Sequence, residues 1–135
     1  MKKKLSCILL IDDNPDDNRF HQIIIKKMGI TDSIQIVQNG LEAIEFLKKD
    51  SEVIPELIFL DINMPKMNGW EFLGAYKDLN IKQKAKALIV MLTTSTNPDD
   101  EKKAKEIQEV MDFQPKPLSV ESLTTILEKY FPDNK

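Results

Sequence analysis

The sequence predicts an α/β domain in which helices cover both faces of a five-stranded parallel sheet. Short apolar runs of strand length alternate with longer amphipathic stretches along all 135 residues. That alternation is typical of parallel strands joined by right-handed helical crossovers. The chain length suits one domain of common size. We therefore expect residues 1–135 to form a single domain.

In the first half of the chain, strands are short apolar runs and the first helix has clear end signals. The run Leu5–Ile11 has the composition of a strand buried on both faces. Asn14 can cap a helix whose first turn holds Pro15, and Gly29 ends it. The apolar stripe expected on that helix comprises Phe20, Ile23, Ile24 and Met28. The next elements are a strand at Ser33–Val37, a helix with the stripe Leu41, Ile44, Phe46 and Leu47, and a strand at Leu57–Leu60.

In the second half, proline and an Asn-Gly pair exclude regular structure from residues 63–69. A helix is expected at Trp70–Tyr76 and a buried strand at Ala87–Leu92. Asn97-Pro98 begins a fourth helix with the same combination of cap and proline. The last elements are a short strand at Val110–Phe113 and a fifth helix, capped by Ser119, that carries Leu123, Ile126, Leu127 and Tyr130.

Composition excludes several classes of protein. The longest apolar run is far shorter than the roughly 20 residues of a membrane span, and the basic start lacks the features of a signal peptide. The one cysteine, Cys7, excludes an internal disulfide and a cysteine-based zinc site. A net charge of -3 argues against a dedicated nucleic-acid binder. We expect a soluble cytoplasmic domain that contacts neither membranes nor nucleic acids directly.

Chemically active side chains follow four of the predicted strands. Asp12 and Asp13 follow the first strand, Asp61 the third, Thr93 the fourth and Lys116 the fifth. Ligands of doubly wound sheets bind at the carboxyl ends of the strands, so these side chains should meet at one edge. Clustered carboxylates repel one another unless a cation binds, and hard oxygen ligands suit Mg²⁺. A lysine and a hydroxyl complete an acceptor site for a phosphoryl group, with Asp61 as the nucleophile.

Each of these residues also has a purely structural interpretation. Asp12 and Asp13 could stabilise the start of the first helix. Asp61 could be a turn residue, Thr93 could cap a turn, and Lys116 could be a surface lysine. The five together favour the chemical interpretation, because all of them fall at the ends of predicted strands.

Three further residues receive structural roles from the sequence. His21 is expected to be a solvated helix residue, Cys7 a core residue and Trp70 a packing residue. The basic run Lys102, Lys103 and Lys105 is expected to form a solvated face that an acidic partner could contact.

Four segments carry a resemblance to a known family. They are ILLIDDNPDD, LIFLDINMPKMNGWEFL, LIVMLTTS and FQPKPL, and they follow one another in family order and spacing. With these segments, the chain resembles the receiver domain of two-component response regulators, in particular the single-domain chemotaxis regulators. The resemblance implies a flavodoxin-like (βα)5 fold with strand order 2-1-3-4-5.

The resemblance also implies an acceptor and a metal site. Asp61 corresponds to the phosphoacceptor of the family. Asp13 corresponds to a direct Mg²⁺ ligand, and Asp12 to a ligand that often acts through water. Asp61 itself and the backbone carbonyl of Asn63 complete the implied metal ligands.

The resemblance further implies a switch. Thr93 would hydrogen-bond the phosphoryl group and Lys116 would pair with it, with a cis peptide between Lys116 and Pro117. Phe113 matches the aromatic position that moves inward when Thr93 approaches the phosphate. The result in the family is a two-state population shift driven by local charge.

In this family, a sensor histidine kinase or a histidine phosphotransfer protein donates the phosphoryl group. The receiver catalyses its own phosphorylation and dephosphorylation and is otherwise not an enzyme. The surface of the fourth helix, fifth strand and fifth helix then changes shape for a downstream protein. With no output domain expected, the chain would act as a stand-alone regulator in a phosphorelay.

Two alternative functions would need residues different from those of a receiver. An aspartate-nucleophile phosphatase needs an acid/base carboxyl two residues after the nucleophile, where this chain has Asn63, which cannot transfer a proton. A phosphate-independent pseudo-receiver that only binds proteins stays open, although such modules usually lack the acceptor, the acidic pair or the lysine.

Overall fold

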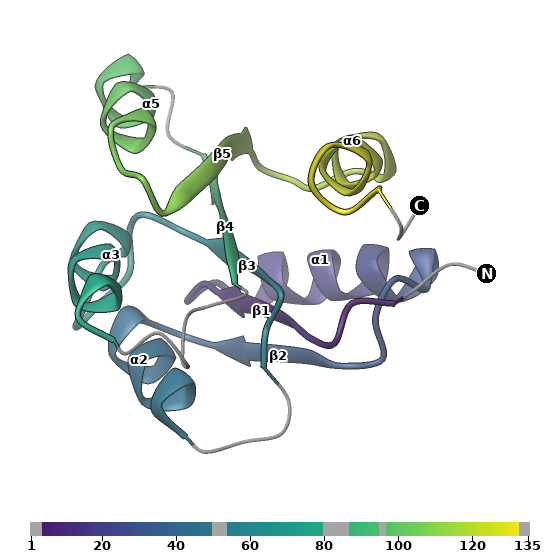
Figure 1. The fold of residues 1–135 in the computed structure, drawn as a ribbon, viewed down its shortest axis with the longest axis horizontal. Coiled ribbons are helices and arrows are strands. Elements are labelled where there is room, and N and C mark those ends of the chain that lie inside the picture. The colour runs from purple at the N-terminus through teal and green to yellow at the C-terminus, as the bar shows by residue number, and fades with distance from the viewer. Residues whose placement is uncertain (1–3, 50–53, 80–86, 95–96, 133–135) are drawn as a thin grey trace.

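The computed structural model describes residues 4–49, 54–79, 87–94 and 97–132, and its centre is a five-stranded parallel sheet (Figure 1). The strands are β1 (Ile8–Ile11), β2 (Ile34–Val37), β3 (Leu57–Leu60), β4 (Leu88–Thr93) and β5 (Val110–Pro115). Their order is β2-β1-β3-β4-β5, and each adjacent pair is parallel. The flavodoxin-like order implied by the resemblance is therefore confirmed.

Helices pack on both faces of this sheet. They are α1 (Pro15–Met28), α2 (Gly40–Lys48), α3 (Gly69–Lys77), α5 (Pro98–Lys105) and α6 (Val120–Tyr130). Alternate residues of the strands point to opposite faces, and they divide the core into two clusters. Leu9 and Ile11 of β1 belong to the cluster with α2, α3 and α5, whereas Ile8 and Leu10 belong to the cluster with α1 and α6. Figure 1 shows the same two layers.

The predicted helix signals act as expected. The Asn14 side chain accepts hydrogen bonds from the backbone N–H groups of Asp16 and Asp17, and Gly29 ends α1 with a φ of 63°. Asn97 caps α5, and Ser119 caps α6. α3 begins one residue earlier than predicted because a capping box between Asn68 and Glu71 precedes it, which leaves Gly69 as the first helical residue.

The first strand is shorter than predicted. β1 begins at Ile8, and Leu5 forms only an isolated parallel bridge with Thr31. Between them, Ser6 turns toward the segment before β3, where its hydroxyl donates to the Ile54 carbonyl at 2.6 Å. Leu5 and Cys7 are therefore buried in the core, but they lie outside the ladder of residue pairs that β1 forms with its neighbouring strands.

The apolar stripe predicted for α1 is partly wrong. Ile24 and Met28 pack against the core, but Phe20 and Ile23 are 44% and 56% exposed. The buried residues of this helix are Asn18, His21 and Ile25. The first half of the inward face of α1 is polar because it lies against Asp12, where the Asn18 side chain donates to the Asp12 carbonyl at 2.9 Å.

Trp70 has the packing role that was predicted. It begins α3 next to Gly69 and packs, partly buried, against the cluster beneath α2, α3 and α5. Lys103 of α5 places its Nζ 4.5 Å from the centre of the indole ring, which is a cation–π interaction. Trp70 therefore joins the start of α3 to α5.

Among the residues that the model describes, no helix combines the length and the apolar character needed to cross a membrane.

Candidate phosphoryl-acceptor site

The ends of four strands bring the predicted residues toward one edge of the sheet. Asp12 follows β1, Asp61 follows β3, Thr93 ends β4 and Lys116 follows β5. β1 and β3 are paired in register up to Ile11 and Leu60, so the residues that follow them emerge side by side. This is the edge at which a doubly wound sheet binds its ligands.

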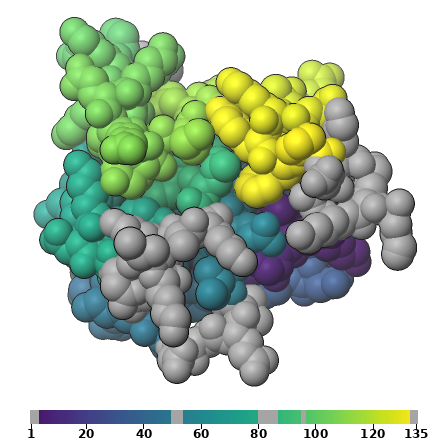
Figure 2. Space-filling model, viewed as in Figure 1, coloured from purple at the N-terminus to yellow at the C-terminus, as the bar shows by residue number. Residues whose placement is uncertain are grey.

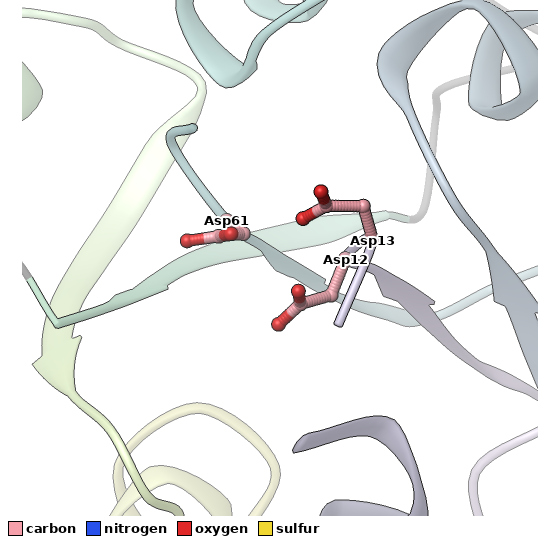
Figure 3. A group of neighbouring side chains, drawn as sticks. All are labelled: Asp12, Asp13 and Asp61. Atoms are coloured by element: carbon pink, nitrogen blue, oxygen red, sulfur yellow. The ribbon is translucent and has the colours of Figure 1, made fainter. Parts of the chain in front are cut away.

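Three carboxylates form the centre of the site. Asp12, Asp13 and Asp61 each offer an oxygen atom, and these atoms lie within 4.8 Å of one another. Figure 3 shows the three side chains together at the ends of β1 and β3. Asp12 is buried and Asp13 exposed, so the cluster lies partly inside the protein and opens to solvent.

The surroundings of Asp61 disfavour its charged form. Burial and the nearby charge of Asp12 raise the pKa of Asp61 from 3.8 to about 6, against the opposing effect of Lys116. At neutral pH the Asp61 carboxylate is therefore ionised but poorly compensated. A cation or an electrophilic phosphorus atom would relieve this unfavourable charge.

Lys116 is the cation of the site. Its side chain is only 7% exposed, and its Nζ lies 2.6 Å from Asp12 Oδ2 and 3.7 Å from Asp61 Oδ2. Burial alone would lower the pKa of Lys116, but hydrogen bonds with Asp12 and Asp17 outweigh it and leave the pKa raised. The ammonium is thus charged and lies beside the acceptor, where it can meet a phosphoryl oxygen.

Thr93 and Lys116 are connected through the backbone. Thr93 is buried at the end of β4, in register with Pro115 of β5. The backbone N–H of Lys116 donates to the Thr93 carbonyl at 2.9 Å. The peptide between Lys116 and Pro117 is cis, as the resemblance implies. The backbone hydrogen bond therefore fixes the position of Lys116 relative to Thr93, the two residues expected to contact the phosphoryl group.

The loop after Asp61 is held by close backbone contacts. The Gly69 N–H donates to the Ile62 carbonyl at 2.8 Å, and the Gly40 N–H donates to the Met67 carbonyl at 2.9 Å. A Cβ atom on Gly69 would lie 2.4 Å from the carbonyl oxygen of Asp61, so no side chain fits there. Asn63 is exposed in this loop, and the role of its carbonyl as a metal ligand stays a prediction.

Phe113 lies between the core and a surface pocket. It is half-buried, packs against the core cluster beneath α2, α3 and α5, and also lines a pocket of about 260 Å³. The other lining residues come from α5, β5 and α6: Glu101, Ala104, Lys105, Val110, Met111, Asp112 and Lys129. Figure 2 shows the surface of α5 and β5 in green beside that of α6 in yellow. A movement of Phe113 would therefore alter this surface.

Sequence reasoning missed three residues of α1 that complete the site. Asp17 binds Lys116, with its Oδ2 2.8 Å from Nζ. Asn18 and His21 line a cavity of about 10 Å³ next to Asp12 and Asp61, enough for roughly one water molecule. Asp17 and His21 are four residues apart, a spacing that places two side chains on one helix face. That spacing shows that the two share a face, but it does not show that the face turns toward the site.

The prediction that His21 is solvated is wrong. His21 is only 2% exposed, because α1 turns this face toward the acidic end of the sheet. Burial, with the charge of Lys116, lowers the pKa of His21 from its ordinary 6.5 and keeps the ring neutral at neutral pH. Its Nε2 and the Oδ1 of Asn18 have no hydrogen-bond partner within the described part of the chain.

The donor set fits Mg²⁺. The three clustered side chains supply only carboxylate oxygens, which are the hard ligands that Mg²⁺ binds. Burial and the charge of Asp12 raise the pKa of Asp61, and a divalent cation would offset both effects. Asp12, Asp13 and Asp61 are the residues that would hold the ion.

A comparison with family models identifies the family to which this domain belongs. The model of the response regulator receiver domain matches residues 8–128. The chain belongs to the response regulator receiver domain family. Receiver domains bind Mg²⁺ at an acidic site and take phosphoryl groups from histidine kinases. Regulators of this kind are generally not true enzymes.

Characterised relatives agree with this family. The chain is 39% identical to the response regulator Rcp1 of Synechocystis over 98 residues, which cover 69% of this chain and 65% of Rcp1. It is 31% identical to the two-component response regulator 24 of Arabidopsis thaliana over 121 residues, covering 90% of this chain and 81% of that protein. It is also 34% identical over 123 residues to the sensor histidine kinase CheAY of Helicobacter pylori, covering 90% of this chain but 14% of the kinase.

Solved receiver structures have the same fold. A two-component response regulator from Cytophaga hutchinsonii superposes with a TM-score of 0.86 at 32% identity, covering 94% of this chain and 97% of that one. The Mn²⁺-bound form of Rcp1 superposes with a TM-score of 0.71 at 33% identity, covering 93% of each chain. That receiver holds a divalent cation.

Proposed function

We propose that this receiver accepts a phosphoryl group on Asp61, with Mg²⁺, from a phosphohistidine of a sensor histidine kinase or a histidine phosphotransfer protein. The observation that supports this most is the position of Lys116, whose buried ammonium lies between Asp12 and Asp61 at the edge where β1 and β3 end. A buried cation beside a poorly compensated carboxylate suits a reaction that delivers a phosphoryl group to that carboxylate.

The chemistry follows from the groups present. A carboxylate oxygen of Asp61 attacks phosphorus, the P–N bond of the donor breaks, and its electron pair stays with the histidine nitrogen. Lys116 and Thr93 then contact the new phosphoryl oxygens. Asp12, Asp13, Asp61 and the Asn63 carbonyl would hold Mg²⁺, which would supply positive charge beside the phosphoryl group. Attack of water on phosphorus later releases inorganic phosphate and restores the Asp61 carboxylate.

The output is a change in a protein-binding surface. Thr93 and Phe113 lie on neighbouring strands, and the residue paired with Phe113 is Met91, two positions before Thr93. Movement of Thr93 toward the phosphoryl group would open space for the Phe113 ring beside the pocket of α5, β5 and α6. A downstream protein that binds this face would then distinguish the phosphorylated receiver from the unphosphorylated one.

Intact-mass measurement tests the acceptor directly. After incubation with Mg²⁺ and acetyl phosphate, we expect a gain of about 80 Da for wild type, the mass that replacement of a carboxyl hydrogen by a phosphoryl group adds. We expect no gain for Asp61→Asn or for wild type with excess chelator. Asp32→Asn is the matched control because its carboxylate is exposed and bonded to Lys4, so it should gain the mass like wild type.

Some receivers react slowly with small donors, so beryllofluoride serves as a second probe of the same site. Binding of Mg²⁺ and beryllofluoride to wild type but not to Asp61→Asn would support the acceptor even without a mass gain. Failure of both probes would overturn the proposal and would favour a phosphate-independent binding module.

A further inference from the structure

Lys116 has a partner that the phosphoryl-acceptor chemistry does not use. Its Nζ lies 2.8 Å from Asp17 Oδ2 and 2.6 Å from Asp12 Oδ2, but 3.7 Å from Asp61 Oδ2. The first two distances are those of charge-assisted hydrogen bonds, and the third is too long for one. In the unphosphorylated receiver, Lys116 is therefore bound to Asp12 and to α1 more closely than to the acceptor.

The position of Asp17 is fixed by the start of α1. The Asn14 side chain accepts hydrogen bonds from the backbone N–H groups of Asp16 and Asp17, which orients the first turn. Asp17 then faces the site, with a side chain that is 35% exposed, whereas Asp16 faces solvent. Two acidic neighbours on one helical turn thus differ in whether they contact Lys116.

The ion pair differs from an ordinary surface pair. Exposed pairs are weak because water and salt screen them, but the Lys116 side chain is only 7% exposed. An ammonium has three N–H donors, and Asp12 and Asp17 occupy two of them. A phosphoryl group on Asp61 would have to share this ammonium with both carboxylates.

We propose that Asp17 is a positioning residue that holds Lys116 on the α1 side of the site and competes with the phosphoryl group for it. The proposal rests on the proposed function, because it concerns the same lysine. By partly neutralising the ammonium, Asp17 weakens its attraction for the phosphoryl oxygens and favours the unphosphorylated state. Its charge would thereby set how strongly this receiver holds a phosphoryl group.

Calorimetric titration with beryllofluoride at saturating Mg²⁺ measures this competition. Asp17→Asn removes the charge but keeps a side chain of the same size and its backbone hydrogen bond to Asn14. We expect it to bind beryllofluoride on the order of threefold to tenfold more tightly than wild type, the size of effect that a partly screened charge gives. Asp16→Asn is the matched control, because it removes the same charge from the same turn without a contact to Lys116, and its affinity should stay within about twofold of wild type.

A second variant separates competition for the lysine from general repulsion of the anion. In a Lys116→Met background, where binding is weaker and more ligand is titrated, Asp17→Asn should change the affinity by less than about twofold. Urea unfolding of each variant reports whether it is folded.

The outcomes are distinct. Unchanged or weaker binding by Asp17→Asn would overturn the competition, as would equal gains from Asp16→Asn or an undiminished gain in the Lys116→Met background. If wild type itself binds no beryllofluoride, the proposed function fails and this inference fails with it. Binding by wild type without a gain in Asp17→Asn would overturn this inference alone.

Discussion

At the scale of single residues, the site holds charge at a cost to the stability of the fold. Asp61 is ionised at neutral pH, although burial and Asp12 raise its pKa to about 6. In the unfolded chain the same carboxyl has a pKa near 3.8. Relative to the unfolded chain, the folded protein therefore favours the protonated acid, and ionisation of Asp61 lowers the free energy of unfolding.

This preference predicts that Asp61→Asn stabilises the fold at neutral pH and loses its advantage in acid. The pKa of Asp61 is higher in the folded state than in the unfolded chain. Below the unfolded-state pKa of 3.8, the carboxyl is protonated in both states and does not lower the stability of wild type. Above the folded-state pKa of about 6, the full loss of stability is present. We expect Asp61→Asn to be more stable by up to about 3 kcal/mol at pH 7.5 without Mg²⁺. Urea unfolding should show the gap narrowing between pH 6 and pH 4. A gap that is the same at both pH values would contradict this origin.

Mg²⁺ should raise the free energy of unfolding of wild type, whereas ionisation of Asp61 lowers it. An ion bound only by the folded state stabilises wild type by mass action, by about 2.7 kcal/mol at a hundred times its dissociation constant. Asp61→Asn lacks one of the carboxylates, so its midpoint of unfolding should rise less with added Mg²⁺. Equal rises in the two proteins, measured by thermal unfolding, would place the ion elsewhere.

At the scale of elements, the loop between β3 and α3 depends on one glycine. A Cβ on Gly69 would lie 2.4 Å from the Asp61 carbonyl oxygen and 3.0 Å from the Ile62 Cα, and these backbone atoms cannot move without displacing the acceptor. Gly74 lies later in α3 and has open space around its missing side chain. The same helix therefore holds a glycine that geometry requires and one that it does not.

We expect Gly69→Ala and Gly74→Ala to have opposite effects. Gly69→Ala should lower the free energy of unfolding by about 2 kcal/mol or more through the forced backbone shift, and should reduce phosphorylation. Gly74→Ala should raise it by about 0.5–1 kcal/mol, because alanine favours the interior of a helix. Urea unfolding and the mass assay measure both. Similar effects at the two positions would rule out the close contact as the cause.

The elements also show what the sequence could and could not predict. Asp12, Asp61 and Lys116 were predictable because a strand end fixes where the next residue lies, whatever the details of packing. Asp17 and His21 were not, because their direction depends on how α1 is rotated about its axis. The apolar residues Phe20 and Ile23 indicated a rotation different from the observed one. In the observed rotation, Asn18 faces the sheet and donates to the Asp12 carbonyl, while Phe20 and Ile23 stay exposed.

At the scale of the whole molecule, β5 connects the sheet edge that holds the site to a second surface, formed with α5 and α6. Lys116 and Thr93 are joined by a backbone hydrogen bond. Phe113 lies on β5, three residues before Lys116, which follows the end of that strand. The pocket beside Phe113 lies between α5, β5 and α6. Its presence was not predictable from the sequence, because its shape depends on how three separate elements pack together.

This arrangement predicts that Phe113→Ala separates phosphorylation from output. The half-buried ring should cost about 1–2 kcal/mol of stability when removed, less than a fully buried one. Phosphorylation of Asp61 should persist. Hydrogen exchange should show that beryllofluoride protects the Asp61 loop in both proteins but alters α5 and α6 in wild type only. An unchanged response of α5 and α6 in Phe113→Ala would exclude this ring as the connection.

The contact between Trp70 and Lys103 has an optical consequence. Trp70 is the one tryptophan of the chain, so its emission has no competing indole signal. The Lys103 ammonium lies 4.5 Å from the ring centre and supplies a strong local electric field, to which indole emission is sensitive. Because the ring belongs to α3 and the ammonium to α5, a displacement of one helix against the other changes that field. If phosphorylation shifts α3 against α5, the emission of Trp70 should change, and the proposed switch could then be followed in real time without any label.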